Sequence, residues 1–449
     1  MNTQSEPRNL TVYRAAEKLR RGELTAEALA TSCMERIQAR DEELQAWVHV
    51  DVDGALKAAR HLDREAREQR WHGPLHGIPV GIKDIIDVEG LETRGGTDAY
   101  PARTAEADAE SVDRLRKAGA IVLGKTVTTP LAYLDAPPTH NPWNLAHTPG
   151  GSSSGSAAAV ADRMCMAALG TQTGGSVLRP AAFNGIVGFK PTYAGIPMAG
   201  IIPAAWQFDT LGTFTRRVED AQLLWHVLRW ERPVDWQATR NKLPPATVPR
   251  APGRVWRVRG FFEKEAEPEA VAALDEVLSR MAKHGVEIVE GPLPESFTGI
   301  HDAHIAILSS ETAAFNLRAY ERDASAFPPK LSMLIRDGLN VPAVRYVEAR
   351  RQRLLFQVEI DALLAGVDVA AMPPAAGPAP RDLTTTGSAS FNSPWSLCGV
   401  PTISIPVRLS EGGVPLGVQL VAREDHEEAL LSVAGWLESL INFNQAPGE

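Results

Sequence analysis

Apolar and charged positions along the first 70 residues alternate with the period of surface helices. In residues 11–70, Ala, Leu and Ile recur three and four positions apart between charges, which predicts amphipathic helices over a core. The pattern then changes to short β-branched runs bounded by glycine at 77–85 and 119–126, with a helical segment at 111–119 between them. This succession of strand, helix and strand predicts an α/β fold.

The middle of the chain combines a long loop with short regular elements. Residues 139–155 hold prolines, asparagines and a Gly/Ser cluster, which predicts a loop. A helix is expected from Ser156, and a strand at 164–170 that leads into the sequence TQTGGS. Five prolines among polar residues at 230–253 predict an exposed connection between two halves of one sheet system.

The last 200 residues return to strands and long helices. A strand is expected at 254–258 and a helix at 268–285, followed by a mainly helical stretch to about residue 366. Two apolar runs at 400–407 and 415–422, separated by a Gly-Gly turn, predict a β-hairpin or two neighbouring strands.

Composition places the chain among ordinary globular proteins. Its 449 residues are 44% hydrophobic and 22% charged, which excludes an intrinsically disordered chain. A formal net charge of −9 argues against a surface built to bind nucleic acid or anionic lipid. The start lacks a signal-peptide pattern and no run of about 18 apolar residues occurs, so we expect a cytoplasmic protein without a membrane span.

Two segments match the residue pattern of known motifs but lack the strand and helix arrangement that those motifs need. Residues 119–126 match a phosphate-binding P-loop, but the apolar residues between the glycines are themselves a strand, so nucleotide binding is disfavoured. Residues 151–155 match the GxSxG nucleophile elbow with Ser153 at the centre, yet no strand precedes them. A flexible loop that caps the next helix is the plainer interpretation of this second segment.

Metal binding is also disfavoured by the sequence. Cys33, Cys165 and Cys398 are far apart and lack CxxC spacing, so neither a disulfide framework nor a thiolate metal site is expected. His301 and His304 have helical spacing, but no third ligand or HExxH pattern accompanies them. We therefore expect neither a metal nor a cofactor.

Three segments taken together carry a more specific signal. Lys83 ends an apolar strand in GPLHGIPVGIKD, Ser152 lies in HTPGGSSSGSAAAVA, and Ser176 follows two glycines in GTQTGGSVLRPA. The order and the intervals of 69 and 24 residues resemble the amidase signature family. The likeness extends to residues 209–221 and 391–407 and is weakest between 230 and 390.

The resemblance implies a Ser-Ser-Lys triad. Ser176 matches the family's nucleophile, Ser152 the bridging serine on a cis peptide, and Lys83 the base. Backbone N–H groups form the oxyanion hole in the family, and here these fall on Thr173, Gly174, Gly175 and Ser176. Because serine is a weak nucleophile, Lys83 must be a neutral amine, and burial in its apolar strand is expected to favour that form.

The resemblance also suggests which residues contact substrate. Val127 and Pro130 stand where the family often has an asparagine and an acid, which favours an apolar or aromatic substrate. Arg179 either clamps a substrate carboxylate or pairs with a structural acid, and we favour the acid, hence neutral aryl amides or carbamates. The residues expected to bind substrate are Gln172, Arg179, Ser153, Tyr133, Trp206 and Trp395.

The expected fold is one α/β/α sandwich with a large mixed central sheet over residues 1–449. Within it, residues 60–225 form the signature core with the triad, 230–253 the surface connection, and 290–366 a helical pocket rim. Such a protein resembles malonamidases and aryl acylamidases more than the amidotransferase subunit of the family.

The function expected from this resemblance is cofactor-independent hydrolysis of a small amide. The alternatives are an esterase or carbamate hydrolase with the same mechanism, and an amidotransferase-like subunit that acts in a complex. The expected partner is a small-molecule amide or carbamate, with no nucleic acid and no membrane, and a homodimer remains open.

Overall fold

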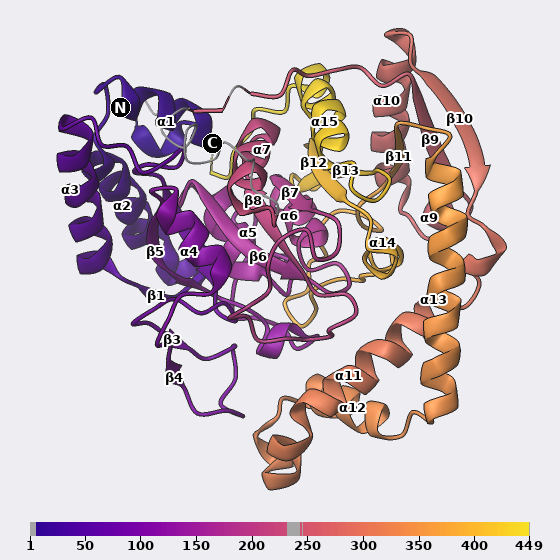
Figure 1. Cartoon of the computed structure of the whole chain (residues 1–449). Coiled ribbons are helices and arrows are strands. Elements are labelled where there is room, and N and C mark those ends of the chain that lie inside the picture. The colour runs from indigo at the N-terminus through magenta and orange to yellow at the C-terminus, as the bar shows by residue number, and fades with distance from the viewer. Residues whose placement is uncertain (1–5, 231–242, 245, 449) are drawn as a thin grey trace.

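A mixed β-sheet crosses the whole molecule in the computed structural model, which describes residues 6–230, 243–244 and 246–448 (Figure 1). Within these residues the sheet has eleven strands in the order β1-β5-β2-β6-β8-β7-β12-β13-β11-β9-β10. Its strands are β1 (Trp47–Val50), β2 (Pro79–Lys83), β5 (Ile121–Thr126), β6 (Ala167–Gln172), β7 (Val187–Lys190), β8 (Thr210–Thr215), β9 (Arg254–Arg259), β10 (Glu287–Pro292), β11 (Val369–Met372), β12 (Thr402–Leu409) and β13 (Pro415–Val421). A separate ribbon pairs β3 (Glu92–Thr93) with β4 (Arg103–Thr104).

Strand directions confirm the predicted mixed α/β sheet. Strands β5, β2 and β6 are parallel neighbours, and β11, β9 and β10 form a second parallel group. Between the two groups the pairing is antiparallel, and the two apolar runs near the C-terminus pair as β12 and β13. Strands from both sides of the connection at 230–253 join this one sheet, although residues 231–242 and 245 of that connection lie outside the described residues.

Helices cover both faces and both ends of the sheet. Figure 1 shows α1, α2 and α3 at the end of the sheet that holds β1, and α10 and α13 at the end that holds β10. The helices are α1 (Val12–Arg20), α2 (Ala26–Leu44), α3 (Val52–Arg67), α4 (Glu110–Lys117), α5 (Ser154–Ala161), α6 (Leu178–Asn184), α7 (Val218–Leu228), α9 (Phe261–Lys264), α10 (Pro268–Lys283), α11 (Ile300–Arg322), α12 (Pro329–Leu339), α13 (Ala343–Leu364), α14 (Ser393–Cys398) and α15 (Glu427–Ile441). None of the helices in the described ranges is both long and apolar enough to span a membrane.

Local sequence explains where the N-terminal helices begin. The hydroxyl of Thr11 accepts a hydrogen bond from the N–H of Arg14 at the start of α1, and Thr25 caps α2 in the same way. Side chains of α1 at spacings of three and four residues are buried, as the periodicity predicts. Strand β1 interrupts this helical region at the edge of the sheet, where it pairs with β5. The sequence pattern does not predict this strand, because four residues are too few to show a clear alternation of apolar and polar positions.

Helix α5 lies against the parallel strands that carry the candidate site. All eight of its residues, SGSAAAVA, are buried, and their small side chains let the helix pack closely on the sheet. The Gly155 position shows how close this approach is, because a Cβ atom there would lie 2.1 Å from the carbonyl oxygen of Ala46. The Gly/Ser-rich sequence thus brings the loop before α5 to the carboxyl ends of β2 and β6.

Candidate active site

The three residues of the expected triad come from neighbouring parts of the sheet. Lys83 is the last residue of β2, which runs parallel to β6, so the carboxyl ends of these strands meet at one edge. Ser152 lies in the loop before α5, and Ser176 lies in the loop between β6 and α6. Side chains at the carboxyl ends of parallel strands are well placed to build a common site.

The amine of Lys83 is buried among hydroxyl groups. Its Nζ atom lies 2.8 Å from Ser152 Oγ and 2.8 Å from Thr171 Oγ1, and the side chain has no exposed surface. Burial lowers the pKa of Lys83 from its ordinary 10.5 to about 7, and the nearby carboxylate of Asp209 opposes this shift. A large fraction of Lys83 is therefore a neutral amine near pH 7, as a base must be.

Contacts on three sides hold the backbone at Ser152. The peptide bond between Gly151 and Ser152 is cis. The N–H of Thr129 donates to Ser152 O at 3.1 Å, and Arg179 Nη2 donates to Gly151 O at 2.6 Å. A Cβ atom at Gly151 would lie 2.8 Å from Thr386 Cγ2, so only glycine fits there without displacement.

Side chains from other elements also fix the segment expected to form the oxyanion hole. Thr173 Oγ1 donates to Asp209 Oδ1 at 2.6 Å, and the carbonyl oxygen of Thr173 lies 3.2 Å from His304 Nε2. Asp209 also accepts from two backbone N–H groups at the start of its own turn, and burial raises its pKa to about 6. These bonds set the orientation of the Thr173 peptide.

The two glycines before Ser176 are held by helix α14. Ser396 Oγ donates to the carbonyl oxygen of Gly174 at 2.7 Å. A Cβ atom at Gly175 would lie 2.5 Å from Oδ1 of Asn392, the residue before α14, so a larger residue at this position would displace the Asn392 side chain. Ser176 itself is 8% exposed at the end of this segment.

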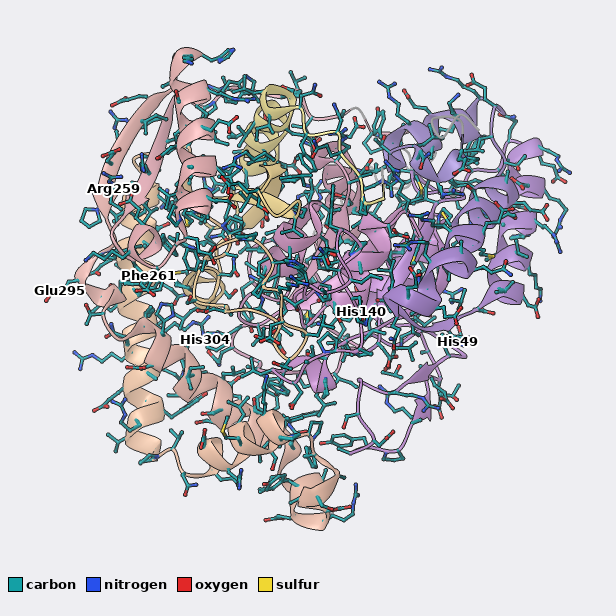
Figure 2. The ribbon with its side chains drawn as sticks, turned by 180° about the vertical axis from the view of Figure 1, so that it is seen from behind. His49, His140, Arg259, Phe261, Glu295 and His304 are labelled. Carbon is teal, nitrogen blue, oxygen red and sulfur yellow. The ribbon has the colours of Figure 1, made fainter. Side chains whose placement is uncertain are left out.

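His304 belongs to α11, where that helix meets the rest of the molecule (Figure 2). Its ring stacks on Phe208 with centroids 4.9 Å apart, and it lies against Gly174, where a Cβ atom would be 3.6 Å from His304 Cε1. Burial lowers the pKa of His304 to about 4, so the ring is neutral near pH 7 and its Nε2–H donates to Thr173 O.

Sequence reasoning missed the roles of Thr171, Asp209 and His304. Thr171 stands five residues before Ser176 in the quoted segment, and its hydroxyl is a recognisable partner for a buried amine. Asp209 is the first residue of the segment 209–221 that resembles the family, but the resemblance implies no chemical role for this residue. The sequence suggests only a metal-ligand role for His304, and its contact with Thr173 joins residues 131 positions apart, which no local pattern reveals.

Gln172 and Ser153 have structural partners in place of the substrate contact expected for them. Gln172 Oε1 accepts from the N–H groups of Val177 and Leu178, and its Nε2 donates to Ser396 at 2.9 Å. Ser153 Oγ bonds the backbone N–H and the carbonyl of Thr171, both at 3.3 Å. Both side chains are fully buried, so they hold together the loops that carry Ser152 and Ser176.

The expected aromatic residues of the pocket are distributed between core and surface. Trp395 has no exposed surface and stacks on Phe262, so it belongs to the core and not to a substrate wall. The Tyr133 hydroxyl donates to Ala204 O at 2.6 Å, which ties the ring to the loop before β8. Trp206 is 48% exposed and has the freedom to contact a bound molecule.

The surroundings of Arg179 differ from the expectation that a structural acid pairs with it. Its guanidinium is 3% exposed and bonds Gly151 O and Thr386 Oγ1, and within the described chain no carboxylate forms an ion pair with it. Burial alone lowers the pKa of Arg179 to about 10, so the group remains a cation near pH 7. The structural acid favoured from the sequence is therefore absent from the residues that the structure describes.

A metal site is not formed by the described residues, in which no three His, Cys, Asp or Glu side chains are grouped as ligands. His301, the second histidine considered for such a site, has its Nδ1 3.3 Å from Ser393 Oγ and stands beside Phe261.

Known proteins match both the sequence and the fold. The amidase family model matches residues 28–431. The A subunit of the glutamyl-tRNA(Gln) amidotransferase of Desulforapulum autotrophicum is 31% identical, over 96% of this chain and 97% of its own length. A crystal structure of an amidase superposes with a TM-score of 0.86 at 30% identity, covering 96% of this chain and 100% of its own.

A peptide amidase from Stenotrophomonas maltophilia is also similar, with a TM-score of 0.82 at 28% identity over 97% of this chain and 98% of its own. The family match covers most of the chain, from α2, the helix before β1, into α15. The chain belongs to the amidase family.

Proposed function

We propose that this protein is an amidohydrolase that cleaves the carbonyl C–N bond of a small amide through an acyl-enzyme on Ser176. The observation that carries the proposal is the Lys83 amine, which is fully buried and bonds the hydroxyls of Ser152 and Thr171. An amine desolvated in this way is a base near neutral pH. In the proposed mechanism the Ser152 hydroxyl, which Lys83 contacts, carries the proton between the amine and Ser176.

In the acylation half of the reaction, Ser176 Oγ attacks the carbonyl carbon of the amide. Its proton passes to Ser152, whose own proton passes to Lys83, so one proton moves and the lysine becomes an ammonium. The oxygen of the tetrahedral intermediate accepts from backbone N–H groups of residues 173–176. The C–N bond then breaks as the proton returns through Ser152 to the leaving nitrogen.

In the second half, water attacks the ester of Ser176. Lys83 takes one proton of the water through Ser152, and that proton returns to Ser176 Oγ when the C–O bond breaks. The carboxylic acid leaves and both serines are restored. A neutral lysine amine has two N–H donors and one lone pair, so it can donate to Thr171 while it accepts from Ser152.

Arg179 favours an amide whose acyl part carries a carboxylate. A buried guanidinium without a carboxylate partner is costly, and a substrate carboxylate would supply the missing negative charge through paired N–H donors. The sequence favoured neutral aryl substrates on the assumption that a structural acid pairs with Arg179. Because none of the described residues supplies such an acid beside the guanidinium, we expect a carboxylated substrate instead. Val127 is buried beside the start of α5, where its carbonyl accepts from Gly155 N–H, and is compatible with an apolar leaving group.

A second candidate is an amidotransferase-like subunit that uses glutamine as its amide. The relative from Desulforapulum autotrophicum is named as such a subunit, and glutamine also combines an amide with a carboxylate. Aryl carbamates are a third substrate class, because the same acyl-enzyme chemistry can act on a urethane carbonyl.

A substrate panel separates these candidates. Wild type and Ser176→Ala are compared on malonamate-like acids, neutral anilides, aryl carbamates and glutamine, with ammonia or amine release as the signal. We expect the wild type to hydrolyse the carboxylated small amides fastest and the variant to lose turnover of every class. Turnover retained by Ser176→Ala would contradict the proposed nucleophile, and a preference for neutral anilides would contradict the role of Arg179.

A further inference from the structure

Helix α13 presents an apolar stripe to solvent. Val344, Val347, Leu354 and Val358 are 68%, 63%, 61% and 69% exposed, which is unusual for four aliphatic side chains on one helix. The opposite face packs on the protein through Ala349, Phe356, Ile360 and Leu364. Figure 1 shows α13 as a long helix along the outer side of the molecule, so nothing in the described chain covers the stripe.

The spacing of the stripe is that of a coiled-coil seam. The four residues stand 3, 7 and 4 positions apart, and Arg351 occupies the position that completes a 3-4-3-4 pattern. Leu355, which is 50% exposed, widens the stripe at its centre. A seam of this kind fits the matching seam of a second helix, because each side chain inserts between residues of its partner.

Charge along α13 selects an antiparallel arrangement. The first half of the helix carries four arginines and one glutamate, whereas the second half carries two acids and no base. Arg350 and Asp361 are eleven residues apart, about three helical turns, so they lie on the same flank of the stripe. An antiparallel second copy brings each Arg350 beside the Asp361 of the other, whereas a parallel copy brings like charges together.

A groove at the end of the stripe supports the same arrangement. It encloses about 590 Å³ between β10 and the end of α13, and its walls include Trp256, Pro294, Leu363 and Val367. Pro294 adjoins Glu295, which Figure 2 shows at the outer edge of the molecule. If Leu354 of one copy packs against Val358 of the other, the start of each α13 reaches the groove of its neighbour.

We propose that α13 is the interface of a homodimer, in which two copies of this chain pair antiparallel about a two-fold axis near Leu355. Such an interface is self-complementary, because the same stripe, the same charges and the same groove are used on both sides. A second copy fits this surface because the arginine-rich first half of α13 faces the acidic second half of its partner, whose end borders the apolar groove. It does not depend on the amidase reaction.

Sedimentation-velocity ultracentrifugation of the full chain tests the interface. The wild type is expected to sediment as a dimer at tens of micromolar. The double variant Leu354→Glu/Val358→Glu is expected to shift to monomer without loss of fold, because both side chains are exposed in one copy. The matched control is Val48→Glu, a 43% exposed valine on β1 at the opposite edge of the sheet, which should remain dimeric.

Two further variants test the direction of the helices. Arg350→Glu should raise the dimer dissociation constant by about tenfold at low salt, and adding Asp361→Arg should restore it. Asp361 also forms an ion pair with Arg423 in its own chain, so the double variant is checked for an unchanged circular dichroism spectrum. Loss of dimer in the double variant as well would contradict the antiparallel register.

Cross-linking distinguishes the two orientations independently. Leu355→Cys lies near the proposed axis and should cross-link to itself with a short bis-maleimide, whereas two Val344→Cys residues should be roughly 36 Å apart along the helices and remain unlinked. The native cysteines are buried and give no background. Self-linking of Val344→Cys alone would overturn the proposal, as would a monomeric wild type or a monomer that instead sediments with anionic phospholipid vesicles.

Discussion

Replacing Lys83 with methionine should change the stability of the protein in a pH-dependent way that identifies the lysine as a buried neutral amine. Methionine keeps most of the side-chain volume and removes the titratable group. Burial lowers the pKa of Lys83 to about 7 in the folded protein, whereas the unfolded chain has the ordinary value of 10.5. Between these two pH values the unfolded chain binds a proton that the folded protein lacks.

The sign and size of the effect follow from that difference in bound protons. Where the unfolded state holds the extra proton, the free energy of unfolding of the wild type rises by about 1.4 kcal/mol for each unit of pH. The Lys83→Met variant lacks this contribution, so the wild type should gain roughly 2 to 3 kcal/mol relative to it between pH 7.5 and 9.5. Well below pH 7, Lys83 is protonated in both the folded and the unfolded state, so the difference in unfolding free energy between the two proteins no longer changes with pH. Lys190, a second buried lysine, is present in both proteins and cancels.

Urea denaturation at pH 7.5, 8.5 and 9.5 measures this difference directly, and activity provides the second signal. For the wild type, kcat/KM should fall about tenfold for each unit of pH below 7 as the amine becomes protonated, and Lys83→Met should be inactive throughout. A stability difference that stays constant between pH 7.5 and 9.5 would refute the reasoning, because it would show that Lys83 titrates alike in both states.

Three further predictions concern the residues around the base. Ser152→Ala should lower kcat by at least about a hundredfold while substrate KM changes little, because it breaks the path between Lys83 and the nucleophile, and steady-state kinetics checks this. His304→Leu removes the donor to Thr173 O and should lower kcat about tenfold or more, and His304→Gln should recover part of it; equal loss in both variants would argue for a packing role alone. Arg179→Gln should reduce kcat/KM for a carboxylated amide far more than for its neutral analogue, and a uniform loss on both would mean that Arg179 acts only through Gly151.

The candidate residues that lie in continuous segments could be picked out from the sequence. Lys83, Ser152 and Ser176 each follow a recognisable strand, loop or turn, and the structure brings Lys83 and Ser152 to 2.8 Å. The mixed sheet was also predictable, because apolar runs bounded by glycine distinguish its strands from the helices. The spacing of apolar residues shows whether a segment is a strand or a helix and which side of it is buried, and this is enough to predict the strands of the sheet.

Side-chain partners from distant segments could not be predicted in this way. The partners of Arg179 are a carbonyl 28 residues away and a hydroxyl 207 residues away, and only the tertiary fold decides that no acid among the described residues pairs with it. The amide of Gln172 was expected to face substrate, but the packing of α14 places Ser396 beside it. Trp395 was expected in the pocket because its segment, residues 391–407, resembles one that the family uses there, but a resemblance between segments does not show which side chains of the segment face the core.

The measurement that tests the central claim most directly is the site of modification by a serine-directed fluorophosphonate. Attack by a serine hydroxyl forms an O–P bond and expels fluoride, so intact mass and peptide mapping report which serine is the nucleophile. We predict one adduct, on Ser176, that forms more slowly below pH 7, is strongly slowed in Lys83→Met and is absent in Ser176→Ala. An adduct on Ser152 or Ser153 in the wild type, or unchanged labelling of Ser176→Ala, would contradict the account.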